Sequence, residues 1–178
     1  MGRPAAGRLT DHMDFLRGAA LIAATMTMGL MAGVFGLYSH TIMPGLRRTD
    51  DRTFVGAFQA MDRAIINPWF MPAFLGALLV TGLGAVLCLG SRYRAVLPWL
   101  VAAFALYLIA FVITIAVNVP LNDAMKAAGL PAGAADLTAI RVRFAETKWA
   151  TWNLVRTVTS TAAFGSLVWA LVVYGGRR

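Results

Sequence analysis

The sequence predicts an all-α integral membrane protein, a bundle of four transmembrane helices in a single domain. Of its 178 residues, 59% are apolar and 13% are charged. In an average soluble domain about 45–50% of the residues are apolar and about 25% are charged. Four segments are almost free of charge: residues 18–43, 68–90, 95–119 and 152–174. Each approaches the ~20 residues that an α-helix needs to cross a bilayer, and the alternating pattern of a membrane β-barrel is absent.

Two longer segments, 44–67 and 120–151, are expected to connect the spans on one side of the membrane. Pro44 and Pro120 are expected to stop the first and third spans, because proline lacks an N–H and clashes with the preceding turn. Both segments are predicted to contain amphipathic helices that lie on the bundle or in the interface. Residues 1–14 are expected to be flexible.

The first connecting helix is expected to begin after Thr49 or Asp50, either of which could cap it. Apolar residues then recur at spacings of four, three and four residues, which is typical of one helix face; they are Phe54, Phe58, Met61 and Ile65. Asn67 and Pro68 indicate an N-cap and the first residue of the second span.

The second connecting helix is expected to be capped by Asp136. Leu137, Ile140 and Phe144 would lie on one of its faces, and it could continue into the fourth span.

The net charge of +8 mainly reflects orientation. Residues 1–17, 91–94 and 175–178 carry seven arginines and two aspartates, whereas 44–67 and 120–151 hold six of the eight acidic residues. The positive-inside rule therefore predicts a plasma (inner) membrane protein with both termini in the cytoplasm. A nucleic-acid partner is not expected, because the chain has no soluble module with a basic face.

The single cysteine and two histidines exclude a disulfide scaffold and the usual four-ligand zinc sites. Gly29 and Gly33 form a GxxxG pattern, which allows close helix packing within the bundle or in a homo-oligomer. The lipid bilayer is the one partner that the composition requires.

Polar residues that could form a site gather at the ends of the spans that meet the two long segments. They are His40, Asn67, Asn118, Asn122, Asp123, Glu146, Asn153 and Arg156, with Trp149 and Trp152 at the same level. Trp149, Asn153 and Arg156 are spaced i, i+4, i+7, so they share one helix face. Because polar groups in a membrane need partners, this cluster is the candidate functional site.

Each candidate also has a structural interpretation. The tryptophans are typical of an interfacial aromatic belt. Asn67 could be only a helix cap, Asn118 could satisfy carbonyls freed by the nearby proline, and His40 could be an ordinary boundary histidine. Arg156 could extend toward the interface, form an ion pair with Asp123 or Glu146, or contact a ligand.

Three stretches resemble signatures of the anthrone oxygenase-like membrane proteins, also known as domain of unknown function 1772. They are Phe58–Phe70, Asn118–Asp123 and Trp149–Thr157, and the resemblance extends over residues 20–174 with the same four-span layout. It implies oxygenation of an anthrone to an anthraquinone with dioxygen and no organic cofactor. The partner would then be a small, flat, lipophilic aromatic substrate.

The candidates can be fitted to this reaction. His40 is the first choice as base, because an imidazole titrates near neutral pH, with Asp123 or Glu146 in reserve. Arg156 would stabilise the oxyanion. The remaining candidates would bind substrate: Asn67, Asn118, Asn122 and Asn153 its oxygens, and Trp149 and Trp152 its rings.

Three alternatives stay open. His40, Asp123 and Glu146 could hold a metal ion as hard N/O ligands. The protein could instead be a non-enzymatic scaffold or partner-binding bundle. A transporter fits less well, because four helices are few and the mid-span positions are apolar.

Overall fold

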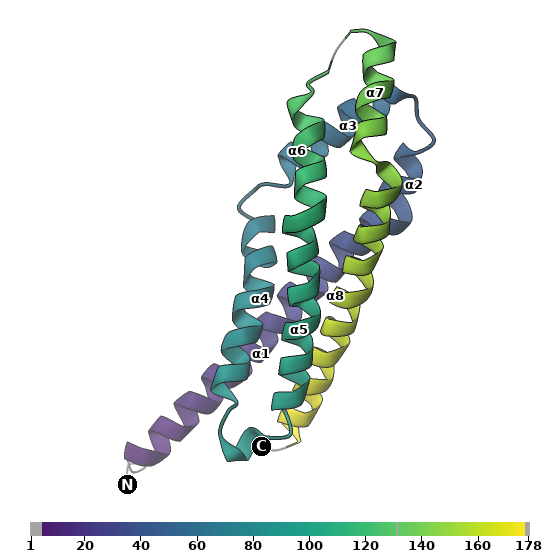
Figure 1. Cartoon of the computed structure of the whole chain (residues 1–178). Helices are drawn as coiled ribbons and strands as arrows, with labels where there is room; N and C mark the ends of the chain where they lie inside the picture. The colour runs from purple at the N-terminus through teal and green to yellow at the C-terminus, as the bar shows by residue number, and fades with distance from the viewer. Residues whose placement is uncertain (1–4, 131, 177–178) are drawn as a thin grey trace.

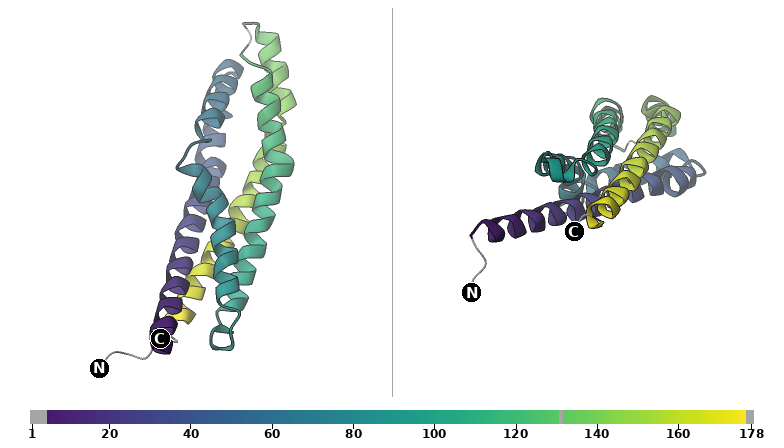
Figure 2. Two further views of the ribbon diagram at one scale, coloured as in Figure 1. Left: turned by 90° about the vertical axis from the view of Figure 1, so that its left-hand side faces the viewer. Right: turned by 90° about the horizontal axis from the view of Figure 1, so that it is seen from below.

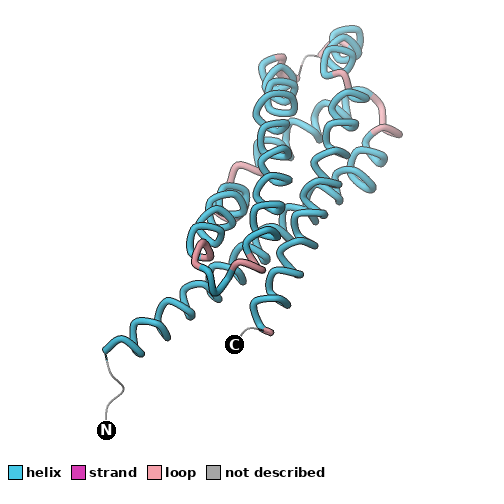
Figure 3. The backbone as a smooth tube through the Cα atoms, turned by 60° about the horizontal axis from the view of Figure 1, so that its bottom comes forward, coloured by secondary structure: helices cyan, strands magenta, loops and turns pink. Residues whose placement is uncertain are grey.

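The computed structural model describes residues 5–130 and 132–176, which form helices and loops and contain no strand (Figures 1 and 3). In chain order the helices are α1 (Ala5–Leu37), η1 (Tyr38–Ile42), α2 (Met43–Leu46), α3 (Asp51–Ala64), α4 (Phe70–Leu87), η2 (Ser91–Tyr93), α5 (Leu97–Ile113), η3 (Thr114–Asn118), α6 (Val119–Ala127), α7 (Ala134–Phe144) and α8 (Glu146–Gly175). The elements η1 and η3 are turns of π-helix, and η2 is a turn of 3₁₀-helix.

Four helical stretches are long and apolar enough to cross a membrane: Asp11–Leu46, Phe70–Leu87, Leu97–Ala127 and Ala135–Gly175. They form an elongated bundle in which α8 packs against α1 and α5, and α4 packs against α1 (Figures 1 and 2). The prediction of an all-helical chain with four candidate spans is confirmed. The first helix begins at Ala5 and is therefore longer than expected. Residues 1–14 were expected to be flexible; residues 1–4 of this segment lie outside the described residues, and the rest belongs to the helix.

The close approach of α1 and α8 depends on Gly29. A Cβ at Gly29 would lie 2.9 Å from Cε2 of Phe164, whereas a Cβ at Gly33 would meet nothing within 4 Å. The first glycine of the GxxxG pattern therefore makes a packing contact within this chain.

Replacing Gly29 by leucine is expected to lower the free energy of unfolding by ~1–3 kcal/mol relative to Gly33→Leu. The added side chain would have to displace the Phe164 ring, while the same change at Gly33 faces open space. Thermal unfolding of the two variants in one detergent measures the difference. Equal stability of the two variants would contradict this account of the α1–α8 contact.

The prediction that Pro44 and Pro120 stop the helices is wrong. Helical conformation continues through both prolines, and each lies in the first turn of a new α-helical segment, α2 or α6. A π turn precedes each one: Met43 N–H donates to Tyr38 O, and Val119 N–H donates to Thr114 O. Proline lacks a backbone N–H, but in the first turn of a helical segment that group is not needed for an intrahelical hydrogen bond. Each proline is therefore tolerated at its position.

The helices α3 and α7 lie together at the end of the bundle opposite the chain termini (Figure 1). Of the two predicted caps, Thr49 and Asp50, it is Asp50 that caps α3, since its carboxylate accepts a hydrogen bond from Thr53 N–H at 3.0 Å. Aromatic rings join the two helices: the Phe144 ring centroid lies 4.5 Å from that of Phe58 and 5.9 Å from that of Phe54. These rings belong to a second apolar cluster, separate from the core between the spans.

Polar contacts also join α3 to α7. The Thr138 hydroxyl donates to Asp51, and the Arg141 guanidinium lies 3.0 Å from the same carboxylate and over the Phe54 ring. These two partners hold the pKa of Asp51 below its ordinary value.

One detail of α7 differs from the prediction. The helix begins at Ala134 with Gly133 as its N-cap, so Asp136 lies in the first turn rather than at the cap. It leads into the last span with one interruption: Ala145, which has a left-handed backbone conformation with φ of 51°, separates α7 from α8 within the stretch Ala135–Gly175.

Candidate functional site

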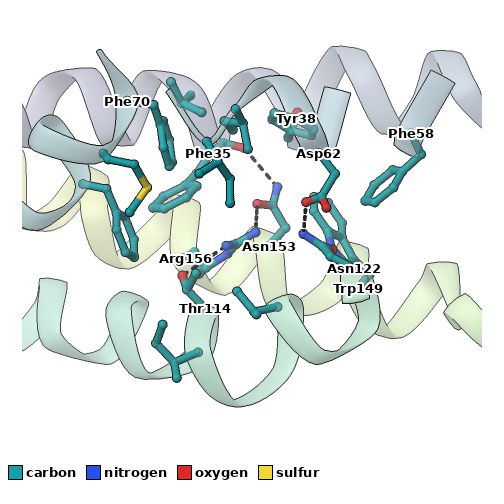
Figure 4. Close-up of a pocket in the computed structure, with 17 residues that line it drawn as sticks. Phe35, Tyr38, Phe58, Asp62, Phe70, Thr114, Asn122, Trp149, Asn153 and Arg156 are labelled. Carbon is teal, nitrogen blue, oxygen red and sulfur yellow. Dashed lines mark hydrogen bonds between the residues drawn. The ribbon is translucent and has the colours of Figure 1, made fainter. Parts of the chain in front are cut away.

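A cavity of about 180 Å³ lies between α1, α3, α4, η3, α6 and α8 (Figure 4). Its wall is mostly apolar, and six side chains supply rings: Phe35, Tyr38, Phe58, Phe70, Phe74 and Trp149. Ile66 and Ile115 also line it, although these side chains are 65% and 53% exposed. The wall of the cavity therefore extends to the surface of the bundle at these two residues.

Arg156 is the buried cation of this cavity and is only 5% exposed. Its NH1 donates to Thr114 Oγ1 at 3.1 Å, and its NH2 donates to Asn153 Oδ1 at 2.7 Å. The guanidinium carbon lies 4.5 Å from the Phe35 ring centroid and 5.5 Å from that of Trp149. All these neighbours are neutral, and the buried Nε has no hydrogen-bond partner.

Asp62, on α3, is the buried carboxylate of the same cavity and is 8% exposed. It accepts a hydrogen bond from Asn122 Nδ2 at 2.7 Å, and Lys126 Nζ lies 3.1 Å from its other oxygen. Asn122 Oδ1 in turn accepts a hydrogen bond from Trp149 Nε1 at 2.7 Å. One side-chain network therefore fixes the carboxylate against α6 and α8.

Asn153 occupies the space between the α1 backbone and Arg156 (Figure 4). Its Nδ2 donates to Phe35 O at 3.0 Å and to Ser39 Oγ at 2.7 Å, while its Oδ1 accepts from Arg156. The side chain is completely buried. Its amide therefore orients the guanidinium and ties α8 to α1.

A comparison with models of protein families matches residues 68–166 to the model described as anthrone oxygenase. The match covers more than half of the chain. The chain belongs to the anthrone oxygenase family. No curated protein and no solved structure matches it. The family match includes α4, α5, α6 and most of the last span, whereas Asp62 and Tyr38 precede the matched residues.

In this member of the anthrone oxygenase family, four of the ten sequence candidates line the cavity: Asn122, Trp149, Asn153 and Arg156. Three of them lie on the face of α8 that the i, i+4, i+7 spacing predicts. The other six candidates lie elsewhere, and the structure shows what each of them contacts.

His40, the first choice as base, is exposed and does not line the cavity. Its Nδ1 lies 2.7 Å from the hydroxyl oxygen of its neighbour Thr41. The structure therefore places this imidazole on the surface of η1, away from the buried polar network.

The two reserve carboxylates also have partners outside the cavity. Glu146 pairs with Arg47 at 2.6 Å and with Arg141 at 3.4 Å, while the exposed Asp123 pairs with Lys126 at 2.9 Å. An ion pair of Arg156 with either carboxylate, one of the interpretations left open, is absent from the described residues. Nor does any group of three His, Cys, Asp or Glu side chains placed to hold a metal ion occur among them.

The last three candidates, Asn67, Asn118 and Trp152, do not line the cavity either. Asn67 accepts hydrogen bonds from the backbone N–H groups of Trp69 and Phe70, both at 2.9 Å, so it caps the second span, which begins two residues later than expected. Asn118 is buried beside the cavity and donates to Trp149 O at 3.3 Å. Trp152 is 38% exposed and does not line the cavity.

Three residues that line the cavity, Asp62, Tyr38 and Thr114, were not predicted as site residues from the sequence. The position of Asp62 could have been predicted, because it follows Phe58 by four residues and therefore lies on the same face of its helix. Tyr38 and Thr114 each begin a π turn, and no pattern in the sequence marked those turns.

Proposed function

We propose that the protein is a membrane oxidoreductase that uses dioxygen to convert a flat, lipophilic aromatic of the anthrone type into a quinone. One observation carries the proposal: a buried carboxylate, Asp62, and a buried guanidinium, Arg156, line the same aromatic-walled cavity without pairing with each other. Family membership supports the same reaction class.

In this proposal Asp62 is the base and Arg156 stabilises the oxyanion. An anthrone carries a weakly acidic C–H opposite its ketone, and removal of that proton places negative charge on the ketone oxygen. A carboxylate held by Asn122 and Lys126 can accept the proton, while the guanidinium can face the charged oxygen. The proposal moves the role of base from His40 to the carboxylate that lines the cavity.

The reaction balances without a further oxidant. The anion gives electrons to dioxygen, a C–O bond forms at the deprotonated carbon, and protonation gives a hydroperoxide. Loss of the second hydrogen from that carbon, with cleavage of the O–O bond, gives the new carbonyl and one water. One dioxygen is consumed for each quinone formed, and the two hydrogens of the carbon leave in the water.

The cavity of about 180 Å³ has room for about one aromatic ring, since an engineered cavity of roughly 150 Å³ holds benzene. The other rings of an anthrone would extend toward the surface beside Ile66 and Ile115, whose apolar side chains suit them. Such a substrate would be soluble in the bilayer, next to these exposed side chains.

We also propose that both termini lie in the cytoplasm of a plasma-membrane protein. The seven arginines of residues 1–17, 91–94 and 175–178 support this orientation. In this orientation α3 and α7 would lie at the opposite interface, on the same side as the cavity.

Oxygen uptake by membranes that contain the chain tests the proposed reaction. After addition of emodin anthrone, these membranes are expected to consume dioxygen faster than membranes without the chain and to form one quinone per dioxygen. Absorbance of the quinone and an oxygen electrode give the ratio. A rate no higher than that of the control membranes would overturn the proposal in favour of a non-enzymatic bundle.

A further inference from the structure

We infer that the cavity binds aromatic organic anions more tightly than their neutral analogues, with the charged oxygen against Arg156. The inference rests on the proposed function for the location of the site and adds a preference for the anion over the neutral ligand. It applies to binding alone, so it can be tested without turnover.

The two charged residues of the cavity wall, Asp62 and Arg156, differ in their partners. Asp62 has a cation beside it, since Lys126 Nζ lies 3.1 Å from its carboxylate, although this lysine also pairs with Asp123. In the described part of the chain, no carboxylate lies within ion-pair distance of Arg156. The guanidinium therefore has no counter-ion in direct contact.

An unpaired charge in a buried site is unfavourable, because desolvation is not repaid by a counter-ion. The hydrogen bonds to Thr114 and Asn153 involve neutral oxygens, and the rings of Phe35 and Trp149 offer only cation–π attraction. A ligand that brings an anionic oxygen to the guanidinium would supply the missing counter-charge.

The remainder of the wall defines the rest of the ligand. Phe58, Phe70 and Phe74 line the cavity together with aliphatic side chains, so the body of the anion should be a flat ring system rather than a phosphate or a small carboxylic acid. Phenolates, enolates and aromatic carboxylates share this chemistry.

Calorimetric titration of the full-length chain in detergent, with matched anionic and neutral ligands, tests the inference. The probes are 2-naphthoate and 2-naphthamide, which have the same rings and differ in charge, and titration of empty micelles corrects for partition. Wild-type protein is expected to bind the anion at least about tenfold more tightly than the amide, which corresponds to about 1.4 kcal/mol.

Asn153→Asp is the decisive variant, because it places a carboxylate 2.7 Å from the Arg156 NH2 without removing the guanidinium. The tenfold preference for naphthoate is expected to disappear. Thr151→Asp is the matched control: it changes the net charge equally on the same helix at an exposed position outside the cavity, and it should retain the preference. Arg156→Lys, which keeps the positive charge, should retain part of it.

Equal affinity of the wild-type protein for the two probes would overturn the inference, even if Asn153→Asp does not fold. A preference that survives in a folded Asn153→Asp variant would overturn it as well. A clear preference for the anion, combined with no oxygen uptake on anthrones, would leave the inference standing and refute the proposed reaction.

Discussion

Replacing Asp62 by asparagine is expected to lower the turnover of an anthrone at least about 100-fold, the usual contribution of a positioned general base. Asparagine has nearly the same shape but cannot accept the proton from the substrate carbon. The hydrogen bond from Asn122 can persist to the remaining carbonyl oxygen. The rate of quinone formation at saturating substrate measures the effect.

Two variants make this prediction specific. Asp123→Asn removes the other carboxylate that pairs with Lys126, and His40→Ala removes the exposed imidazole of η1. Both residues lie outside the cavity, so turnover is expected to stay within about threefold of wild type, a change of well under 1.4 kcal/mol in the barrier. A large loss in His40→Ala with full activity in Asp62→Asn would reverse the assignment of the base.

Replacing Asn153 by leucine is expected to lower the free energy of unfolding by about 3 kcal/mol. The change leaves one Arg156 donor without its acceptor and the Phe35 carbonyl without its side-chain donor, and each such loss in a buried region costs about 1–3 kcal/mol before relaxation. The Ser39 hydroxyl keeps Thr157 Oγ1 as a partner at 3.0 Å. Chemical or thermal unfolding in detergent, followed by circular dichroism, measures the loss.

Asn118→Leu is the control for this prediction. Asn118 is as deeply buried as Asn153, but it makes one hydrogen bond of 3.3 Å and its Oδ1 has no partner. Its loss should therefore lower the stability by less than about 1 kcal/mol. If both variants lose the same free energy of unfolding, the contribution of Asn153 to stability comes from its burial and not from its hydrogen bonds.

The four-span architecture could be predicted because hydropathy and charge-free length are properties of contiguous sequence. The shared face of Trp149, Asn153 and Arg156 could be predicted for the same reason: α8 is a regular helix there, so spacing alone gives direction. The cap at Asn67 likewise depends only on neighbouring backbone groups.

The composition of the cavity could not be predicted in this way. Asp62 enters it because α3 packs against the ends of the spans, a tertiary contact that no local pattern describes. His40 and Trp152 stand at the expected level but on outward-facing parts of their helices, and rotation about a helix axis is determined by packing. Glu146 is occupied by Arg47 and Arg141, which come from other parts of the chain.

The two π turns let the chain hold one more residue than a plain α-helix of the same course. A π turn contains one residue more than an α turn and widens to hold it, so deleting one residue from Thr114–Asn118 would close it to an α turn. The helix beyond would keep nearly the same direction and would move along its axis by only about 1.5 Å, so Asn122 would still face Asp62 and Trp149. The same deletion in the regular helix α5 would instead turn everything beyond it by about 100°. One-residue alignment gaps are therefore expected more often in these two turns than within α5.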